Sequence, residues 1–426
     1  MSAVPLPAAN QPVSTGRSLA YVYVGYGFRY LYLLVLIPFY GRILGTEAYG
    51  QLTAAMSLFL VVWLTVEWGF PLAGTRDIAQ ARTPQACAQV YGQQLSGRLC
   101  LCLPAIALGL CAAWFSPVLR AAPGMAALAI VNGLVAAFNM GWFFVGTLRF
   151  RSSVWLEVLG FALNLGLITT LVHGPADAPL VMAILAGSSV VCTVIAHTIA
   201  SSMFRGAVVR LHGGLALLRA CFSLFVHRGL SMAMLGSTAL VMSLFSSPLQ
   251  VGLYGAADRL AGAALSLLQP ANQVLVGLVT HRLGEPAHTA SGYRLIRLGL
   301  LLITGVGVLM MLGTLAIAPL LVPLVFGPGF DASISMLQAL SILFPMAALV
   351  QVITGQVLIP HRLDLASSWV SLFGALATVA LIFALGQAHG GTGVSWARVA
   401  GHGVMLLAAL WALWHHGLLH TVFQRP

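Results

Sequence analysis

The chain has 426 residues, of which 59% are hydrophobic and only 7% are charged, and its formal net charge is +11. Soluble globular domains carry about 25% charged residues, so this composition excludes them and predicts a protein whose solvent is lipid. All 20 basic residues are Arg, and they are spread over short connecting segments rather than gathered in a run, which argues against nucleic acid as a partner. At roughly 20 apolar residues per crossing, the length allows about a dozen membrane-spanning helices.

The first half of the chain is predicted to be a lobe of six spans. It begins with a polar segment, residues 1–17, that lacks a signal-peptide cleavage pattern and is predicted to be a cytoplasmic tail. Residues 18–200 form the N-terminal lobe, because apolar runs of spanning length alternate there with short polar connections. These runs are 18–39, 48–70, 88–116, 124–146, 154–173 and 179–200.

A hydrophilic stretch, residues 201–228, separates this lobe from a second set of six spans. It has no acidic residue and is predicted to be a cytoplasmic linker whose side chains bind anionic lipid headgroups through Arg205, Arg210, Arg219 and Arg228. The C-terminal lobe is predicted over 229–416, with its first turns from about residue 215. Its apolar runs are 215–245, 250–279, 295–325, 333–359, 366–386 and 393–416, and a cytoplasmic tail is predicted for 417–426.

The distribution of Arg predicts the orientation. With the N-terminus in the cytoplasm, the outer side has only Arg42 and Arg120, and Arg29, Arg259 and Arg398 lie inside spans. Cytoplasmic segments carry an excess of basic residues, so both termini are predicted to be cytoplasmic. The fifteen residues assigned to the cytoplasmic side are Arg17, Arg76, Arg82, Arg98, Arg149, Arg151, Arg205, Arg210, Arg219, Arg228, Arg282, Arg294, Arg297, Arg362 and Arg425.

A short sequence repeat occurs in both halves of the chain. Tyr49-Gly50 lies just inside the second span, and Tyr254-Gly255 lies just inside the eighth. One dipeptide is a weak signal, but its position at matching points of both halves indicates a parallel repeat. In transporters with such repeats, the substrate site lies at the interface between the halves.

A charged residue within a span costs free energy to place in lipid, so each one is a candidate functional residue. Arg29 lies near the middle of the first span, and Arg259 lies at a similar depth in the eighth, beside Asp258. For these residues a structural pairing is the alternative, with Asp258 as the partner of Arg259 or Arg29. Asp258 is also the candidate site for a coupling H+ or Na+. For Arg398, near the start of the last span, a side chain turned out to the membrane surface is the alternative.

Polar stripes indicate that some spans face water rather than lipid. At steps of three or four residues, the eighth span carries Arg259, Gly262, Ser266, Gln269 and Gln273. The fourth span has a smaller stripe with Asn132 and Asn139 next to Trp142, and the first has Tyr23, Tyr26 and Tyr30 beside Arg29. The predicted substrate-binding residues of a central cavity are therefore Arg29, Arg259, Asn139, Trp142, Ser266, Gln269, Gln273, Tyr26 and Arg398.

These side chains suit one kind of cargo. Guanidinium groups bind phosphate oxygens with two parallel hydrogen bonds and stay charged. Amides and hydroxyls bind sugar hydroxyls, and aromatic rings pack on the apolar faces of sugars. A lipid diphosphate carrying a few sugars needs all three.

Several segments resemble a known family. RILGTEAYGQL (42–52), GFPLAGTRDIAQAR (69–82), FNMGWFFVGTLRF (138–150), VGLYGAADRLAG (251–262) and FGPGFDASISMLQAL (326–340) are similar to the Wzx-type polysaccharide flippases of the multidrug/oligosaccharidyl-lipid/polysaccharide superfamily. The resemblance implies a two-lobed, V-shaped bundle of twelve helices in the bacterial inner membrane, working by alternating access. It also implies an undecaprenyl-diphosphate-linked oligosaccharide as substrate, coupling to a cation gradient without a cofactor, and a polysaccharide polymerase complex as a partner.

Two other functions are alternatives. A drug or cation antiporter of the same superfamily would need carboxylates in the membrane, whereas the deepest lone charges here are arginines. A membrane-embedded polymerase or glycosyltransferase is disfavoured because such enzymes have large outer loops, and the predicted ones are only a few residues long. No catalytic or metal-ligating cluster is predicted, since the six Cys have no companion ligands and His415-His416 lacks a third.

Overall fold

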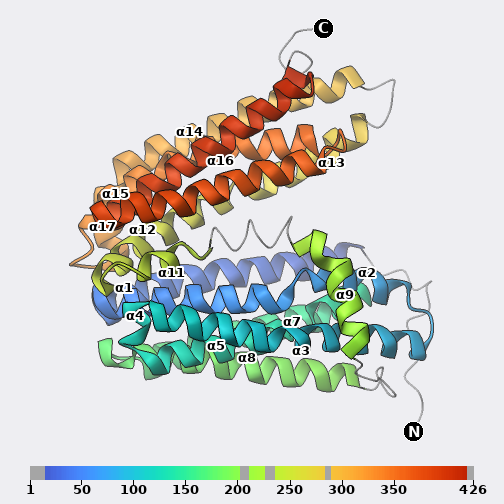
Figure 1. Cartoon of the computed structure of the whole chain (residues 1–426), viewed down its shortest axis with the longest axis horizontal. Coiled ribbons are helices and arrows are strands. Elements are labelled where there is room, and N and C mark those ends of the chain that lie inside the picture. Colours follow the sequence, from blue (N-terminus) through green and yellow to red (C-terminus); the bar gives the residue numbers. More distant parts are fainter. Residues whose placement is uncertain (1–14, 202–210, 226–235, 284–288, 420–426) are drawn as a thin grey trace. The chain divides into compact units, whose positions relative to one another are not determined.

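A computed structural model of the chain describes residues 15–201, 211–225, 236–283 and 289–419 (Figure 1). For residues 15–34, 211–212, 223 and 289–290 it describes the backbone alone. Every element in the described residues is helical, and nine helices there are long and apolar enough to cross a membrane. The predicted all-helical membrane fold is therefore confirmed, while the number of twelve spans stays a prediction.

The chain divides into two compact units, residues 1–244 and 245–426. The helices of the first unit are α1 (Thr15–Glu67), α2 (Phe70–Gln80), α3 (Pro84–Phe115), α4 (Pro117–Arg120), α5 (Pro123–Ala137), α6 (Gly141–Gly146), α7 (Phe150–Leu171), the short turn η1 (Pro175–Asp177), α8 (Ala178–Ala200), α9 (Leu211–Leu224) and α11 (Thr238–Ser243). Those of the second are α12 (Pro248–Ser266), α13 (Gln269–Leu283), α14 (Thr289–Phe326), α15 (Ala332–Ser341), α16 (Leu343–Val352), the π-helical turn η5 (Ile353–Leu358) and α17 (Asp364–His415).

Two of the long helices contain a break at a glycine. The backbone of α1 leaves the helical conformation at Gly45 (φ 70°, ψ 177°), and that of α17 leaves it at Gly390 (φ 57°, ψ −138°). Both conformations lie in the left-handed half of the backbone map that side chains with a Cβ rarely adopt. The breaks fall between the predicted spans 18–39 and 48–70 and between 366–386 and 393–416, so each helix corresponds to two predicted spans.

Two other predicted spans are interrupted within the membrane-spanning length. The fourth is divided between α5 and α6, which are separated by residues 138–140. The eighth is divided between α12 and α13, with the break at 267–268 just before Pro270. Proline removes a backbone donor and clashes with the preceding turn, which explains a break at this point.

The segment predicted to be a linker is partly an ordered helix. α9 lies across the helices of the first unit in Figure 1 and packs on α3. The indole nitrogen of Trp68 donates a hydrogen bond to the Leu218 carbonyl (3.2 Å), and its ring stacks on Phe225 with centroids 3.9 Å apart. α11, which was assigned to the seventh span, packs on α1 of the first unit. The rest of that span includes 226–235, which lie outside the described residues.

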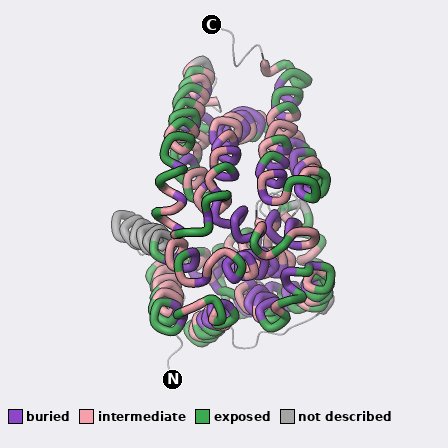
Figure 2. Tube along the Cα trace, turned by 90° about the vertical axis from the view of Figure 1, so that its left-hand side faces the viewer, coloured by how far each residue is buried: buried purple, intermediate pink, exposed green. Residues whose placement is uncertain are grey.

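Packing within each unit relies on close contact, because lipid offers no hydrophobic driving force between helices. α1 packs on α5 where Gly133 meets Val62, and a Cβ at Gly133 would lie 2.8 Å from the Val62 side chain. In the second unit the Ser333 hydroxyl donates to the Leu253 carbonyl (2.7 Å) between α12 and α15. Figure 2 shows buried and exposed positions alternating along the helices of each unit, as expected of helices with one packed and one outward face.

Candidate functional site

The first unit contains a cavity of about 770 Å³ among α1, α5, α6, α7 and α8. This volume is in the range of about 300–1,000 Å³ that is usual for sites binding small molecules. The wall combines aromatic rings, amides, hydroxyls and one carboxylate. Those side chains are Phe59, Trp63, Phe144, Phe161, Asn139, Asn164, Ser153, Ser188, Ser189, Thr193 and Glu157.

Two polar atoms in the cavity wall are buried without a hydrogen-bond partner among the described residues. They are Oδ1 of Asn164 on α7 and the hydroxyl oxygen of Ser188 on α8. The neighbouring Ser189 hydroxyl donates to Oδ1 of Asn132 (2.7 Å). Of these two adjacent hydroxyl groups on α8, only that of Ser189 therefore has a partner among the described residues. A buried polar atom that stays unpaired costs free energy, and a ligand bearing hydroxyl groups would recover it.

Asn139 holds the break between α5 and α6. Its Nδ2 donates to the Ala136 carbonyl and its Oδ1 accepts from the Gly141 amide, both at 3.0 Å. The side chain is exposed and lines the cavity, and its amide keeps a donor and an acceptor position for a ligand. The predicted site residue is thus positioned by the local geometry of the broken span.

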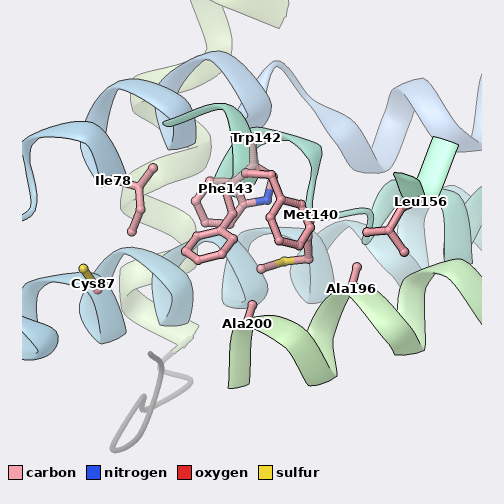
Figure 3. Close-up of a cluster of buried hydrophobic side chains, with 9 residues drawn as sticks. Ile78, Cys87, Met140, Trp142, Phe143, Leu156, Ala196 and Ala200 are labelled. Atoms are coloured by element: carbon pink, nitrogen blue, oxygen red, sulfur yellow. The ribbon is translucent and has the colours of Figure 1, made fainter. Parts of the chain in front are cut away.

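One wall of the cavity is the edge of a packed hydrophobic cluster, shown in Figure 3. Met140, Phe144, Leu156 and Ala196 belong both to this cluster and to the cavity lining. Trp142, predicted to bind substrate, is 4% exposed and lies inside the cluster against Phe143, with ring centroids 6.1 Å apart. Trp142 is not among the residues that line the cavity, so in this structure its ring belongs to the packed cluster rather than to the cavity surface.

Arg98, which was counted with the cytoplasmic arginines and falls within the predicted span 88–116, is a buried residue of the helix bundle. The residue lies on α3 and is 3% exposed. Its Nε donates to the Ala137 carbonyl at the end of α5 (2.8 Å), and one Nη donates to Oε1 of Gln94 (2.8 Å). The guanidinium also lies over the Phe70 and Trp142 rings, at 5.5 and 5.9 Å. A cation at the carbonyl end of a helix is favourable, so Arg98 stabilises the point where the fourth span breaks.

In the second unit the structure brings together two of the predicted residues. Arg398 on α17 forms an ion pair with Asp258 on α12, and the same Nη1 donates to the Tyr254 hydroxyl (2.9 Å). The Arg398 side chain is 5% exposed and that of Asp258 is 28% exposed. Arg398 therefore points into the unit rather than out to the membrane surface. This pairing of Asp258 with Arg398 was not among the predicted alternatives, which were Arg259 and Arg29.

The remaining predicted residues lie on both sides of the helix break in the eighth span. Arg259 and Ser266 belong to α12 and are partly buried, whereas Gln269 and Gln273 belong to α13 and are exposed. The stripe is therefore not carried by one continuous helix. Arg29 and Tyr26 lie on α1, but their side chains are outside the described residues.

That one face of α7 lines a cavity was not predicted from the sequence, although the spacing of its residues indicates such a face. Glu157, Gly160, Phe161 and Asn164 recur at steps of three and four residues, and all four line the cavity. This is the same spacing that marked the stripe on the eighth span. That Ser188 has no partner among the described residues has no sequence signal, because it depends on which helix faces α8.

The family described as polysaccharide biosynthesis protein matches residues 15–278, which confirms the resemblance predicted from the sequence. A protein of Escherichia coli (strain K12) named as an O-antigen transporter is 23% identical over 385 residues, covering 88% of this chain and 90% of that protein. A protein of Shigella dysenteriae with the same name is 20% identical over 383 residues, covering 89% and 94%.

The fold is similar to that of solved transporters. The lipid II flippase MurJ in an inward closed conformation aligns with a TM-score of 0.70 and 11% identity, covering 95% of this chain and 90% of that chain. A multidrug resistance transporter of the MATE family, in an inward-facing conformation, aligns with a TM-score of 0.61 and 15% identity, covering 92% and 99%.

Proposed function

The chain belongs to the polysaccharide biosynthesis protein family, and on this premise we propose that it is a transporter that flips a lipid-linked oligosaccharide across the bacterial inner membrane. The relatives named as O-antigen transporters and the MurJ-like fold support this proposal. The cargo would be an undecaprenyl-diphosphate-linked repeat unit, moved from the cytoplasmic to the outer leaflet by alternating access.

The observation that carries the proposal is the cavity of the first unit. It offers unpaired polar atoms at Asn164 and Ser188 beside the aromatic rings of Phe59, Trp63 and Phe161. This combination suits sugars, whose hydroxyls form hydrogen bonds while their ring faces pack on aromatic groups. Its volume of about 770 Å³ has room for a compact sugar unit rather than for a long glycan.

The diphosphate would be bound by arginine. We keep Arg29 and Arg259 as its ligands, because a guanidinium binds phosphate oxygens in pairs and cannot lose its proton. With both termini in the cytoplasm, as the positive-inside distribution predicts, the cargo would enter from the cytoplasmic side and be released near a polysaccharide polymerase complex.

Coupling to H+ or Na+ remains part of the proposal, with Asp258 as its site. The carboxylate is partly accessible and pairs with the buried Arg398. Binding of a cation to Asp258 would compete with this pair, so the charge of Arg398 would have to find another partner. That competition would link ion binding to a rearrangement of α12 against α17.

The second candidate is a cation-coupled drug antiporter, which one observation favours. Glu157 lines the cavity of the first unit, and a carboxylate in a partly apolar cavity is suited to an organic cation. Substitution Glu157→Gln separates the two functions, because it removes a cation ligand but keeps a group that can bind sugar hydroxyls. Loss of resistance to a cationic drug, with normal glycan export, would favour the antiporter.

The first experiment is to locate the lipid-linked oligosaccharide in a deletion strain, by its accessibility to an outer-face glycosidase. Intact, unpolymerised units that accumulate on the cytoplasmic face are expected for loss of a flippase. Units that reach the outer face and stay unpolymerised would contradict transport and favour a polymerase.

The cavity itself is tested by Asn164→Leu, with Thr169→Val as the matched control on α7. We expect export to fall roughly tenfold or more, since a hydrogen bond to a buried group is worth about 1.5 kcal/mol. Stability should be unchanged or higher, because the substitution removes an unpaired buried atom. Thr169 donates to the Leu165 carbonyl (2.7 Å) and does not line the cavity, so Thr169→Val should export normally.

The phosphate ligands are tested by Arg29→Ala and Arg259→Ala. Each should abolish export while the protein still inserts into the membrane, and Lys at either position should restore only part of it because the paired geometry is lost. Normal export by either Ala variant would return that arginine to a structural role.

A further inference from the structure

The second unit has a cleft of about 590 Å³ that the proposed transport cavity does not use. It lies where α13 and α14 pack on one another, and three of its lining side chains are arginines. Arg282 comes from the last turn of α13, and Arg294 and Arg297 come from the first turns of α14, beside Ser291. All three were assigned to the cytoplasmic side by the distribution of charge.

The charge of this cleft is not balanced by its own lining. No carboxylate is among the lining residues that the structure describes, and Glu285, the acid nearest in sequence, lies outside the described residues. Nε of Arg297 is buried and has no hydrogen-bond partner in the described part of the chain. Like charges in a partly desolvated cleft repel one another, and an anion would remove this cost and supply the missing acceptor.

The cleft is also amphiphilic along α14. Its polar end holds Ser291 and Arg294, and its apolar end holds Leu298 and Leu301, which are 44% and 73% exposed. From Ser291 to Leu301 the helix rises about 15 Å, at 1.5 Å per residue. A ligand that fills the cleft therefore needs a compact anionic head and a hydrocarbon chain attached to it.

We propose that this arginine cleft binds the phosphate headgroup of an anionic phospholipid from the cytoplasmic leaflet, with an acyl chain lying against Leu298 and Leu301. The transported lipid diphosphate shares this chemistry but fits less well. Among the described residues, its lining has no amide and no aromatic ring for sugars. A basic pocket between spanning helices on the cytoplasmic side is a known way to hold anionic lipid.

The proposal is tested on the purified full-length protein in detergent, by native mass spectrometry with added phosphatidylglycerol or phosphatidylcholine. The wild type should retain phosphatidylglycerol in preference to phosphatidylcholine. The variant Arg294→Gln/Arg297→Gln should lose at least about tenfold in apparent affinity for phosphatidylglycerol, since two charge-assisted contacts are removed. Arg294→Lys/Arg297→Lys should lose less, because the charges are kept.

The matched control is Arg82→Gln/Arg151→Gln, which removes the same charge from exposed positions that are not part of the cleft lining. It should bind phosphatidylglycerol like the wild type, and an equal loss would overturn the proposal in favour of general surface charge. Undecaprenyl phosphate that displaces phosphatidylglycerol at lower concentration would overturn it in favour of a cargo site. If the double variant is not monodisperse, Arg297→Gln alone is compared with Arg151→Gln.

Discussion

The ion pair between Asp258 and Arg398 predicts that its two single substitutions differ in cost. Asp258→Asn would leave the guanidinium, whose side chain is 5% exposed, with only neutral partners such as the Tyr254 hydroxyl. Removing one member of a buried pair in this way costs about 3–5 kcal/mol. We therefore expect Asp258→Asn to lower the free energy of unfolding by an amount in that range.

Arg398→Met leaves the carboxylate behind instead. Asp258 is 28% exposed, so its carboxylate keeps contact with water, and the expected cost is about 1–3 kcal/mol. The double variant should cost less than the sum of the two, with a coupling of about 0.5–3 kcal/mol. The difference between the single variants, about 2 kcal/mol, comes from which charge is left in the interior.

The assay is a titration with SDS in mixed micelles, with unfolding followed by tryptophan fluorescence. The control is Asp331→Asn, an exposed carboxylate whose side chain caps no helix amide, and it should change the free energy by less than about 0.5 kcal/mol. Arg398→Met that costs as much as Asp258→Asn, or more, would refute the reasoning from burial.

The same titration tests two other features. Arg98→Met should cost about 2–4 kcal/mol because the Ala137 carbonyl and other buried acceptors lose their donor, and a cost under about 1 kcal/mol would show that they find other partners. Gly45→Ala should cost about 1–3 kcal/mol through backbone strain, since no atom of the described residues lies within 4 Å of the new Cβ. Gly390→Ala should cost more, because its Cβ would lie 2.7 Å from Oε1 of Gln250, which accepts the Gly391 amide; an equal or smaller cost would contradict this.

Much of the helical frame follows from local sequence. Apolar runs of spanning length predicted where the long helices lie, and the breaks at Gly45 and Gly390 fall in the predicted gaps. The breaks inside the fourth and eighth spans were not predicted, although Pro270 marks one of them. An apolar run reports how much of the chain is in lipid, but it does not report whether the helix is continuous.

The site was only partly predictable, because its pairings are distant in sequence. Arg398 is 140 residues from Asp258, and no local pattern could identify it as a partner of that carboxylate. Arg98 was counted only as part of the charge distribution, and its role at the end of a helix 39 residues away has no local signal. Spacing alone predicts a polar face, and only the packing decides which polar atoms stay unpaired.

The shortage of acids gives these observations a common cause. With nine acidic residues for twenty arginines, carboxylates cannot balance most of the guanidinium groups. Arg398 is neutralised by Asp258, and Arg98 is satisfied by carbonyl oxygens and aromatic faces. Nε of Arg297 is also buried, but among the described residues it has no hydrogen-bond acceptor. An anion from outside the chain would supply the acceptor that Nε of Arg297 lacks among the described residues.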